Sequence, residues 1–162
     1  MIRTLAAALA ACALLLACAH PSQIAPGTPA AEVVRALGQP SGRYPLAGGG
    51  ERLQYSSQPA GQTVHNVDLD AGGRVVRVEQ ALNEGLFPQR IRPDVWTRAD
   101  VLREYGPPAR TMGVHNFDGT IWLWRYLDGP TWRLLFIDID RAGVVRGWSN
   151  GDEALPDPPD AR

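Results

Sequence analysis

Apolar and polar positions follow the same order twice along the chain. From residue 97, a short run with helical spacing ends at Gly106, alternating runs typical of strands follow, and an aspartate-containing turn leads to Gly143. A weaker version of this order precedes it, with Gly38 at the end of the helical run and Gly73 in the turn. Because repetition on this scale marks duplicated structural units, the sequence predicts two copies of one α+β module.

Each copy is expected to begin with a short helix. Thr28-Pro29 starts the first, with a hydroxyl residue as N-cap and proline at the first helical position, and Gly38 ends it. In the second copy, Thr97 and Asp100 have the spacing of a capping box, and Gly106 ends the helix. Helices of this length do not persist alone, so we expect each one to lie on a sheet.

The expected strands are separated by short turns rich in glycine, proline and aspartate, which favours antiparallel hairpins with the helix on one face. These strands span residues 42–45, 52–56, 63–69 and 75–78 in the first copy, and 110–114, 120–126, 132–139 and 144–148 in the second. The predicted fold class is α+β, with two tandem repeats that each pack a short helix on a three- to four-stranded antiparallel sheet. The pattern leaves open whether the two sheets are continuous.

The first 17 residues have the features of a signal peptide, with Arg3 followed by an apolar run too short to span a bilayer comfortably. The run ends in Leu15-Leu16-Ala17-Cys18, which resembles the lipobox of bacterial lipoproteins and implies cleavage before Cys18 and acylation of that residue. Leu9-Ala10-Ala11-Cys12 also fits the box, but cleavage there leaves a very short apolar run. The alternative is an ordinary signal peptide with an incidental cysteine.

Changes in composition divide the rest of the chain. We expect a tether at 18–27, a first repeat at 28–80, a linker at 81–96, a second repeat at 97–149 and a disordered tail at 150–162. Ala19 follows the cysteine, where aspartate favours inner-membrane retention in enterobacterial lipoproteins. By that analogy we expect outer-membrane localisation on the periplasmic side.

The order of helix, Gly-x-Pro, strands and Asp-x-x-Gly-x-Val resembles the BamE-like (SmpA/OmlA) family of outer-membrane lipoproteins. The family's helix motif is matched by Thr97, Val101, Gly106 and Pro108, and more loosely by Thr28, Val33, Gly38 and Pro40. The tandem arrangement is also similar to the β-lactamase inhibitor protein fold. The resemblance implies a helix on an antiparallel sheet in each repeat, and a role in outer-membrane protein assembly or envelope integrity.

Alternation along the strands separates core residues from the opposite face of each sheet. The predicted core rows are Leu53, Tyr55, His65, Val67 and Leu69 in the first copy, and Trp122, Trp124, Tyr126, Leu135, Ile137 and Ile139 in the second. An open sheet face should be polar, and the first copy follows this rule with residues such as Gln62 and Asn66. We therefore expect the polar row of the first copy to face solvent.

The second copy is apolar on both faces. Its opposite row contains Ile121, Leu123, Trp132, Leu134 and Phe136, which are our candidate partner-binding residues. An exposed apolar patch of this kind marks an interaction site. The alternative is that the linker or the other repeat covers the row.

Catalytic or metal chemistry is not indicated. The stretch Asp68–Glu79 has some spacing of a calcium loop, but turn-forming aspartate and glycine explain it more simply. His20, His65 and His115 have no ligand spacing, and no serine or threonine lies in a nucleophile elbow. The net charge of −1 argues against nucleic-acid binding. We expect a protein without cofactor, metal or enzymatic activity.

The sequence thus favours a binding or scaffold module, attached to the outer membrane through acyl chains on Cys18 and docking an envelope protein. Two alternatives remain open at this point. One is an inhibitor of an envelope enzyme, and the other is a carrier of lipid or a small ligand between sheet and helices.

Overall fold

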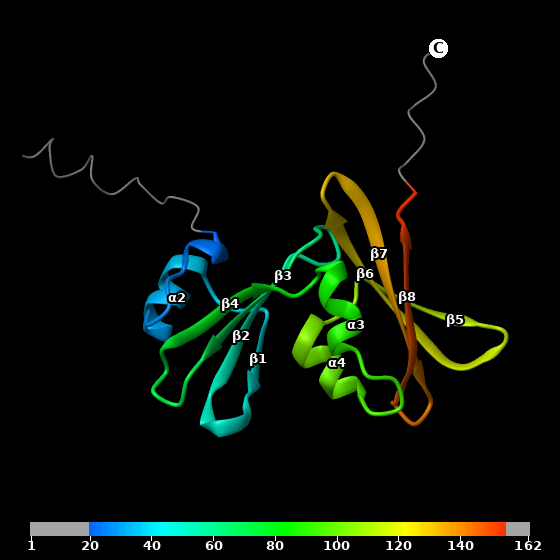
Figure 1. Cartoon of the computed structure of the whole chain (residues 1–162), viewed down its shortest axis with the longest axis horizontal. Coiled ribbons are helices and arrows are strands. Elements are labelled where there is room, and N and C mark those ends of the chain that lie inside the picture. The colour runs from blue at the N-terminus through cyan, green and yellow to red at the C-terminus, as the bar shows by residue number, and fades with distance from the viewer. Residues whose placement is uncertain (1–19, 155–162) are drawn as a thin grey trace, which may run out of the picture.

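The structure is a computed structural model and describes residues 20–154 (Figure 1). The signal peptide, the acylation candidate Cys18 and residues 155–162 lie outside the described residues. Two four-stranded antiparallel sheets account for most of the described chain, and each is accompanied by a helix of eight residues. The predicted α+β class with two repeated helix-and-sheet units is confirmed, and the two sheets are separate.

Sheet 1 belongs to the first repeat and has its strands in chain order, β1-β2-β3-β4. Its elements are η2 (Pro21–Gln23), α2 (Ala30–Leu37), β1 (Gly42–Pro45), η3 (Ala47–Gly49), β2 (Glu51–Ser56), β3 (Val64–Leu69) and β4 (Val75–Gln80). Helix α2 places Val33 against one face of the sheet, where it packs with Leu53, Val67, Leu69 and Val75 in a small apolar core.

Sheet 2 has the same order, β5-β6-β7-β8, with longer strands. Its elements are η4 (Glu84–Leu86), α3 (Phe87–Arg90), α4 (Arg98–Tyr105), β5 (Arg110–Val114), β6 (Phe117–Asp128), β7 (Thr131–Asp140) and β8 (Val145–Asp152). Strand β8 runs three residues further than Ser149, so residues 150–152 of the predicted tail belong to the sheet instead.

The helix ends follow the capping signals of the sequence closely. Thr97 and Asp100 form the predicted capping box, and Gly38 and Gly106 end their helices at φ 83° and 69°, a region that favours glycine. The first helix begins one residue later than expected. Pro29 is its N-cap, and the Thr28 hydroxyl donates to the carbonyl of Ala25 at 2.7 Å instead of capping the helix.

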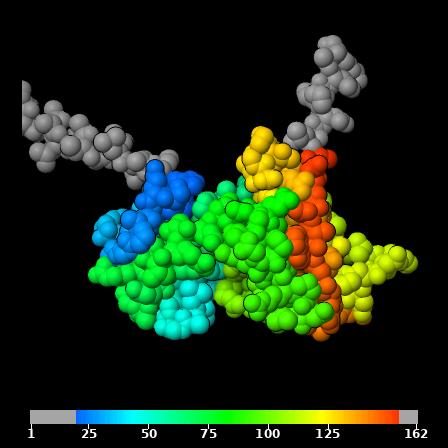
Figure 2. Space-filling model, in the orientation of Figure 1, coloured from blue at the N-terminus to red at the C-terminus, as the bar shows by residue number. Residues whose placement is uncertain are grey.

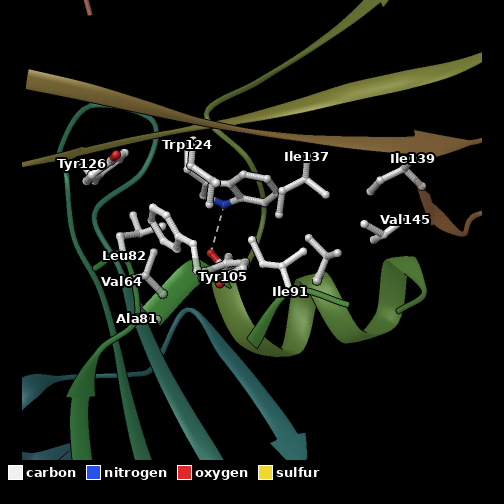
Figure 3. Close-up of a cluster of buried hydrophobic side chains, with 13 residues drawn as sticks. Val64, Ala81, Leu82, Ile91, Tyr105, Trp124, Tyr126, Ile137, Ile139 and Val145 are labelled. Carbon is white, nitrogen blue, oxygen red and sulfur yellow. Dashed lines mark hydrogen bonds between the residues drawn. The ribbon is translucent and has the colours of Figure 1, made fainter. Parts of the chain in front are cut away.

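The core of sheet 2 is the larger of the two and confirms the predicted aromatic row (Figure 3). Trp124 is fully buried, and its indole N–H donates to the backbone carbonyl of Tyr105 at the end of α4, at 3.0 Å. The linker takes part in this core. Its buried residues are Ala81, Leu82, Phe87 and Ile91. Segment 81–96 is therefore a structural component that covers the inner face of sheet 2.

Residues 18–27 were predicted to form a free tether, but the part that the structure describes, 20–27, is packed on sheet 1. Residues 20–27 pack against sheet 1, with Ile24 in contact with its core and the Gly27 amide donating to the carbonyl of Val75 at 2.7 Å. Proline and glycine content suggested a free linker, but main-chain pairing with β4 gives this stretch a fixed path.

Candidate docking surface and the interface behind it

The polar face of sheet 1 is buried, which corrects the expectation that it faces solvent. Helix α4 of the second repeat covers it, and Arg52 is only 4% exposed. The fully or nearly buried polar residues on this face are Arg52, Gln54, Asn66 and Asp68. Sequence periodicity records which residues share a face, but it does not show what packs on that face.

These polar side chains pair with the C-terminal end of α4, where helix carbonyls have no partner within the helix. Asn66 Nδ2 donates to the carbonyl of Glu104 at 2.9 Å, and Arg52 Nη1 donates to the carbonyl of Arg103 at 3.2 Å. Gln54 Nε2 donates to the carbonyl of Arg103 at 3.3 Å. The positive charge of Arg52 also matches the partial negative charge of the helix C-terminus. The two repeats are thus joined by a polar interface in which side-chain donors of sheet 1 meet carbonyls of α4, while the buried Gln54 Oε1 has no hydrogen-bond partner among the described residues.

Ion pairs extend this interface. The guanidinium of Arg52 binds the Asp68 carboxylate at 2.6 Å and that of Glu104 at 2.6 Å, and Arg77 binds Asp68 at 2.7 Å. Glu104 also forms an ion pair with Arg90, which lies in α3. Burial alone would raise the pKa of Asp68, but hydrogen bonds from Arg52 and Arg77 and their charges outweigh it and lower that pKa. The Asp68 carboxylate is therefore ionised at neutral pH, and the ion pairs cross the boundary between the repeats at Arg52 and Glu104.

A second contact between the repeats lies at the β2–β3 turn. The side-chain amide of Gln58 donates to the backbone carbonyl of Arg125 at 2.7 Å and accepts from its backbone amide at 3.3 Å. This position on β6 lies beyond the last β5 partner, because the β5 ladder ends at Leu123. The guanidinium of Arg125 then donates to the carbonyl of Ala60 at 2.9 Å. The turn thus takes the place of a neighbouring strand at this edge.

The candidate partner-binding residues lie on one face of sheet 2, which we call the open face. It consists of Ile121, Leu123, Trp132, Leu134 and Phe136, and it lies opposite the aromatic core because neighbours along a strand alternate between faces. Trp132 is 37% exposed, and Ile121, Leu134 and Phe136 are half-buried. Leu123 is different. It is 4% exposed, so it does not belong to the exposed patch that the sequence predicted.

Leu123 and Leu134 line a surface hollow of about 370 Å³ on this face. The other lining residues are Pro59, Ala109, Arg110, Arg125, Glu153 and Ala154. Arg125 and Glu153 form an ion pair at 2.7 Å beside the leucines. Sequence reasoning missed these polar residues. The one available signal was Arg125, a charged residue within a long apolar strand.

Trp132 is held in a defined position at one end of the open face. The guanidinium of Arg125 lies over the Trp132 ring at 5.2 Å from the centroid. The backbone carbonyl of Trp132 accepts from the Glu153 amide at 2.9 Å. Leu127, which the sequence analysis did not single out, lies opposite it in the ladder and is 46% exposed. A fixed aromatic residue loses little conformational entropy on binding, which suits a contact residue.

The aspartate carboxylates of the two turns accept hydrogen bonds within their own hairpins, and two of the histidines lie side by side. The carboxylate of Asp70 accepts from the amides of Gly72 and Arg74, and that of Asp140 accepts from the amide of Val144, so both cap their hairpins. His65 is buried beside His20, with ring centroids 5.0 Å apart, and burial lowers its pKa. Within residues 20–154, no group of three His, Cys, Asp or Glu side chains is arranged to hold a metal ion.

Comparison with known proteins gives little further information. No family model matches the chain, and no curated protein matches it. A similar solved structure is that of a DUF4309 family protein, YjgB, from Bacillus subtilis subsp. subtilis str. 168. It is 14% identical, the match covers 78% of this chain and 79% of that chain, and the TM-score is 0.30, so it carries no argument. None of the helices in the described part has the length and apolar content to cross a bilayer.

Proposed function

We propose that this protein is an outer-membrane lipoprotein on the periplasmic side that binds an envelope protein through the open face of sheet 2. The observation that carries the proposal is the apolar character of that face in an antiparallel sheet whose other face is already filled by helices and linker. An antiparallel sheet with one covered face normally presents polar residues on the other. A retained apolar row, with Trp132 exposed, is the signature of a docking surface.

The mechanism we propose is noncovalent docking at a membrane surface. Acyl chains on Cys18 would confine the protein to that surface, which raises its effective concentration toward partners held in the same membrane. A side chain of the partner would enter the hollow beside Leu134, while Arg110 at the same hollow offers a charged contact. Such a surface suits the family resemblance, which implies a role in outer-membrane protein assembly or envelope integrity.

A ligand carrier is less well supported than a docking module. A carrier of the kind suggested by the sequence needs a cavity between sheet and helices. In the described chain, the space between sheet 2 and its helices is occupied by Phe87, Tyr105 and Trp124, all fully buried and in edge or tilted ring contact (Figure 3). The hollow lies on the opposite face, where it is open to a protein partner.

Affinity purification from membranes tests the docking proposal with a matched pair of variants. Leu134→Asn places a polar amide in the open face, and Val76→Asn makes the same kind of change at an exposed apolar position on sheet 1. We expect specific envelope proteins to copurify with the wild type and with Val76→Asn, and to be lost by roughly tenfold or more with Leu134→Asn, as removal of a central contact commonly does. Equal recovery with both folded variants contradicts the open face as the docking site.

A further inference from the structure

The described structure begins at His20, two residues after the predicted acylation site Cys18. From His20 onward, the chain packs on sheet 1. The His20 ring lies against that of His65, and the His20 backbone amide donates to the Gln23 side chain at 3.1 Å. Two residues of chain span at most about 7 Å, so the Cα of Cys18 cannot be further than that from the Cα of His20. The inference that follows rests on the proposed acylation of Cys18. If the proposal holds, the bilayer surface lies directly beside His20.

Contacts lead from His20 along one edge of the molecule to the β6–β7 hairpin. His20 shares a shallow hollow with Ser57 and Thr63 at the base of the β2–β3 turn. That turn continues to Ala60, whose carbonyl binds Arg125, and Arg125 lies over the ring of Trp132. Figure 1 shows the start of the described chain, the β2–β3 turn and the β6–β7 turn along the same upper edge.

The tip of the β6–β7 hairpin carries two exposed large apolar side chains, with the exposed Asp128 beside them. Leu127 and Trp132 are paired across the ladder and are among the few large apolar residues of the described chain that are well exposed. Exposed Gly129 and Pro130 complete the turn between the strands. The turn protrudes above the body of the protein in the space-filling view (Figure 2). Tryptophan prefers the membrane–water interface because its ring is apolar and its N–H is polar.

We infer that the tip of the β6–β7 hairpin, Leu127 to Trp132, is a second membrane contact that inserts into the lipid surface beside the acylated N-terminus. The buried ionic interface and the Gln58 contact hold the two repeats together, so the acyl chains and the tip act as two separate points of attachment. Two points along one edge fix the tilt of the protein on the bilayer. The rest of the open face then extends away from the membrane, where a partner can reach Leu134 and Phe136.

Site-specific fluorescence in proteoliposomes tests this contact on the acylated, full-length mature protein. The chain has two cysteines, of which Cys12 lies in the leader and Cys18 is the acylation site, so an introduced cysteine provides a single free thiol. The polarity-sensitive dye NBD is attached at Leu127→Cys and Ala60→Cys on the upper edge. Val95→Cys, in the loop between α3 and α4, provides an exposed control on the opposite edge (Figure 1).

We expect NBD at residue 127 to shift its emission to shorter wavelength and to be quenched by a nitroxide on the upper acyl chain, consistent with a depth of about 5–10 Å. The probe at residue 60 should show a smaller quenching, and the probe at residue 95 none. An unshifted, unquenched probe at 127, or equal quenching at 127 and 95, overturns the inference. The bound protein floats with the vesicles in every case if Cys18 is acylated. Failure of the tip contact is therefore distinguishable from failure of the lipoprotein proposal.

Discussion

Arg52→Met is expected to lower the free energy of unfolding by about 3–5 kcal/mol, a large part of the roughly 5–15 kcal/mol that stabilises a typical domain. The substitution keeps much of the apolar stem but removes the guanidinium that joins Asp68 of sheet 1 to Glu104 of α4. Both carboxylates are largely buried, so each loses a charge partner that water cannot fully replace. Urea-induced unfolding of protein produced without the leader measures the change.

Arg43→Met is the matched control for this prediction. Arg43 lies on the neighbouring strand of the same sheet and pairs with Glu51 at 3.0 Å, but both side chains are almost half exposed. We expect its loss to change the free energy of unfolding by about 0–1 kcal/mol, as is usual for exposed pairs. Similar costs for Arg52→Met and Arg43→Met would show that the network between the repeats does not stabilise the fold in the way we describe.

Cys18→Ala is expected to move the protein almost completely from the membrane fraction to the soluble periplasmic fraction. Each buried methylene of an acyl chain contributes about 0.8 kcal/mol to attachment, so losing several chains removes the dominant membrane affinity. The exposed tip at Leu127 and Trp132 is too small to replace it. Fractionation of cells, together with incorporation of labelled palmitate, measures both attachment and acylation.

Cys12→Ala distinguishes the two possible lipoboxes. Because cleavage before Cys12 leaves a very short apolar run, we expect this variant to be acylated and membrane-bound like the wild type. Loss of palmitate in Cys12→Ala, with normal labelling of Cys18→Ala, would place the mature N-terminus at Cys12 instead. In that case the chain between the membrane and His20 is longer, and the tip need not touch the bilayer.

Local sequence signals predicted the elements of this fold well. The capping box at Thr97 and the glycines at 38 and 106 define helix ends through backbone geometry, which is a local property. The alternation that places Trp124 and Ile137 in one core row follows from the two-residue period of a strand. Strand order also followed, because short turns join antiparallel neighbours in sequence.

What the sequence could not show is how the repeats pack on each other. The polar row at Gln54 and Asn66 has the composition of a solvent-facing surface, and only the carbonyls at the end of α4 make its burial favourable. Leu123 was placed on the correct face, but it is buried, and the hollow that it lines also includes Pro59 and Glu153, which are distant in sequence. The apolar row was therefore predicted on the correct face of sheet 2, but the burial of Leu123 was not predicted.

The central claim is that the open face of sheet 2 binds an envelope protein. Photo-crosslinking in living cells tests this claim most directly. A benzophenone amino acid is placed at Phe136 in the open face or at Val76 on sheet 1, with native Cys18 retained in both. We predict that the probe at 136 forms a crosslink to a defined envelope protein, and that Leu134→Asn in the same chain abolishes it. The same crosslinks from both sites, or none from residue 136 in correctly localised protein, would contradict the account.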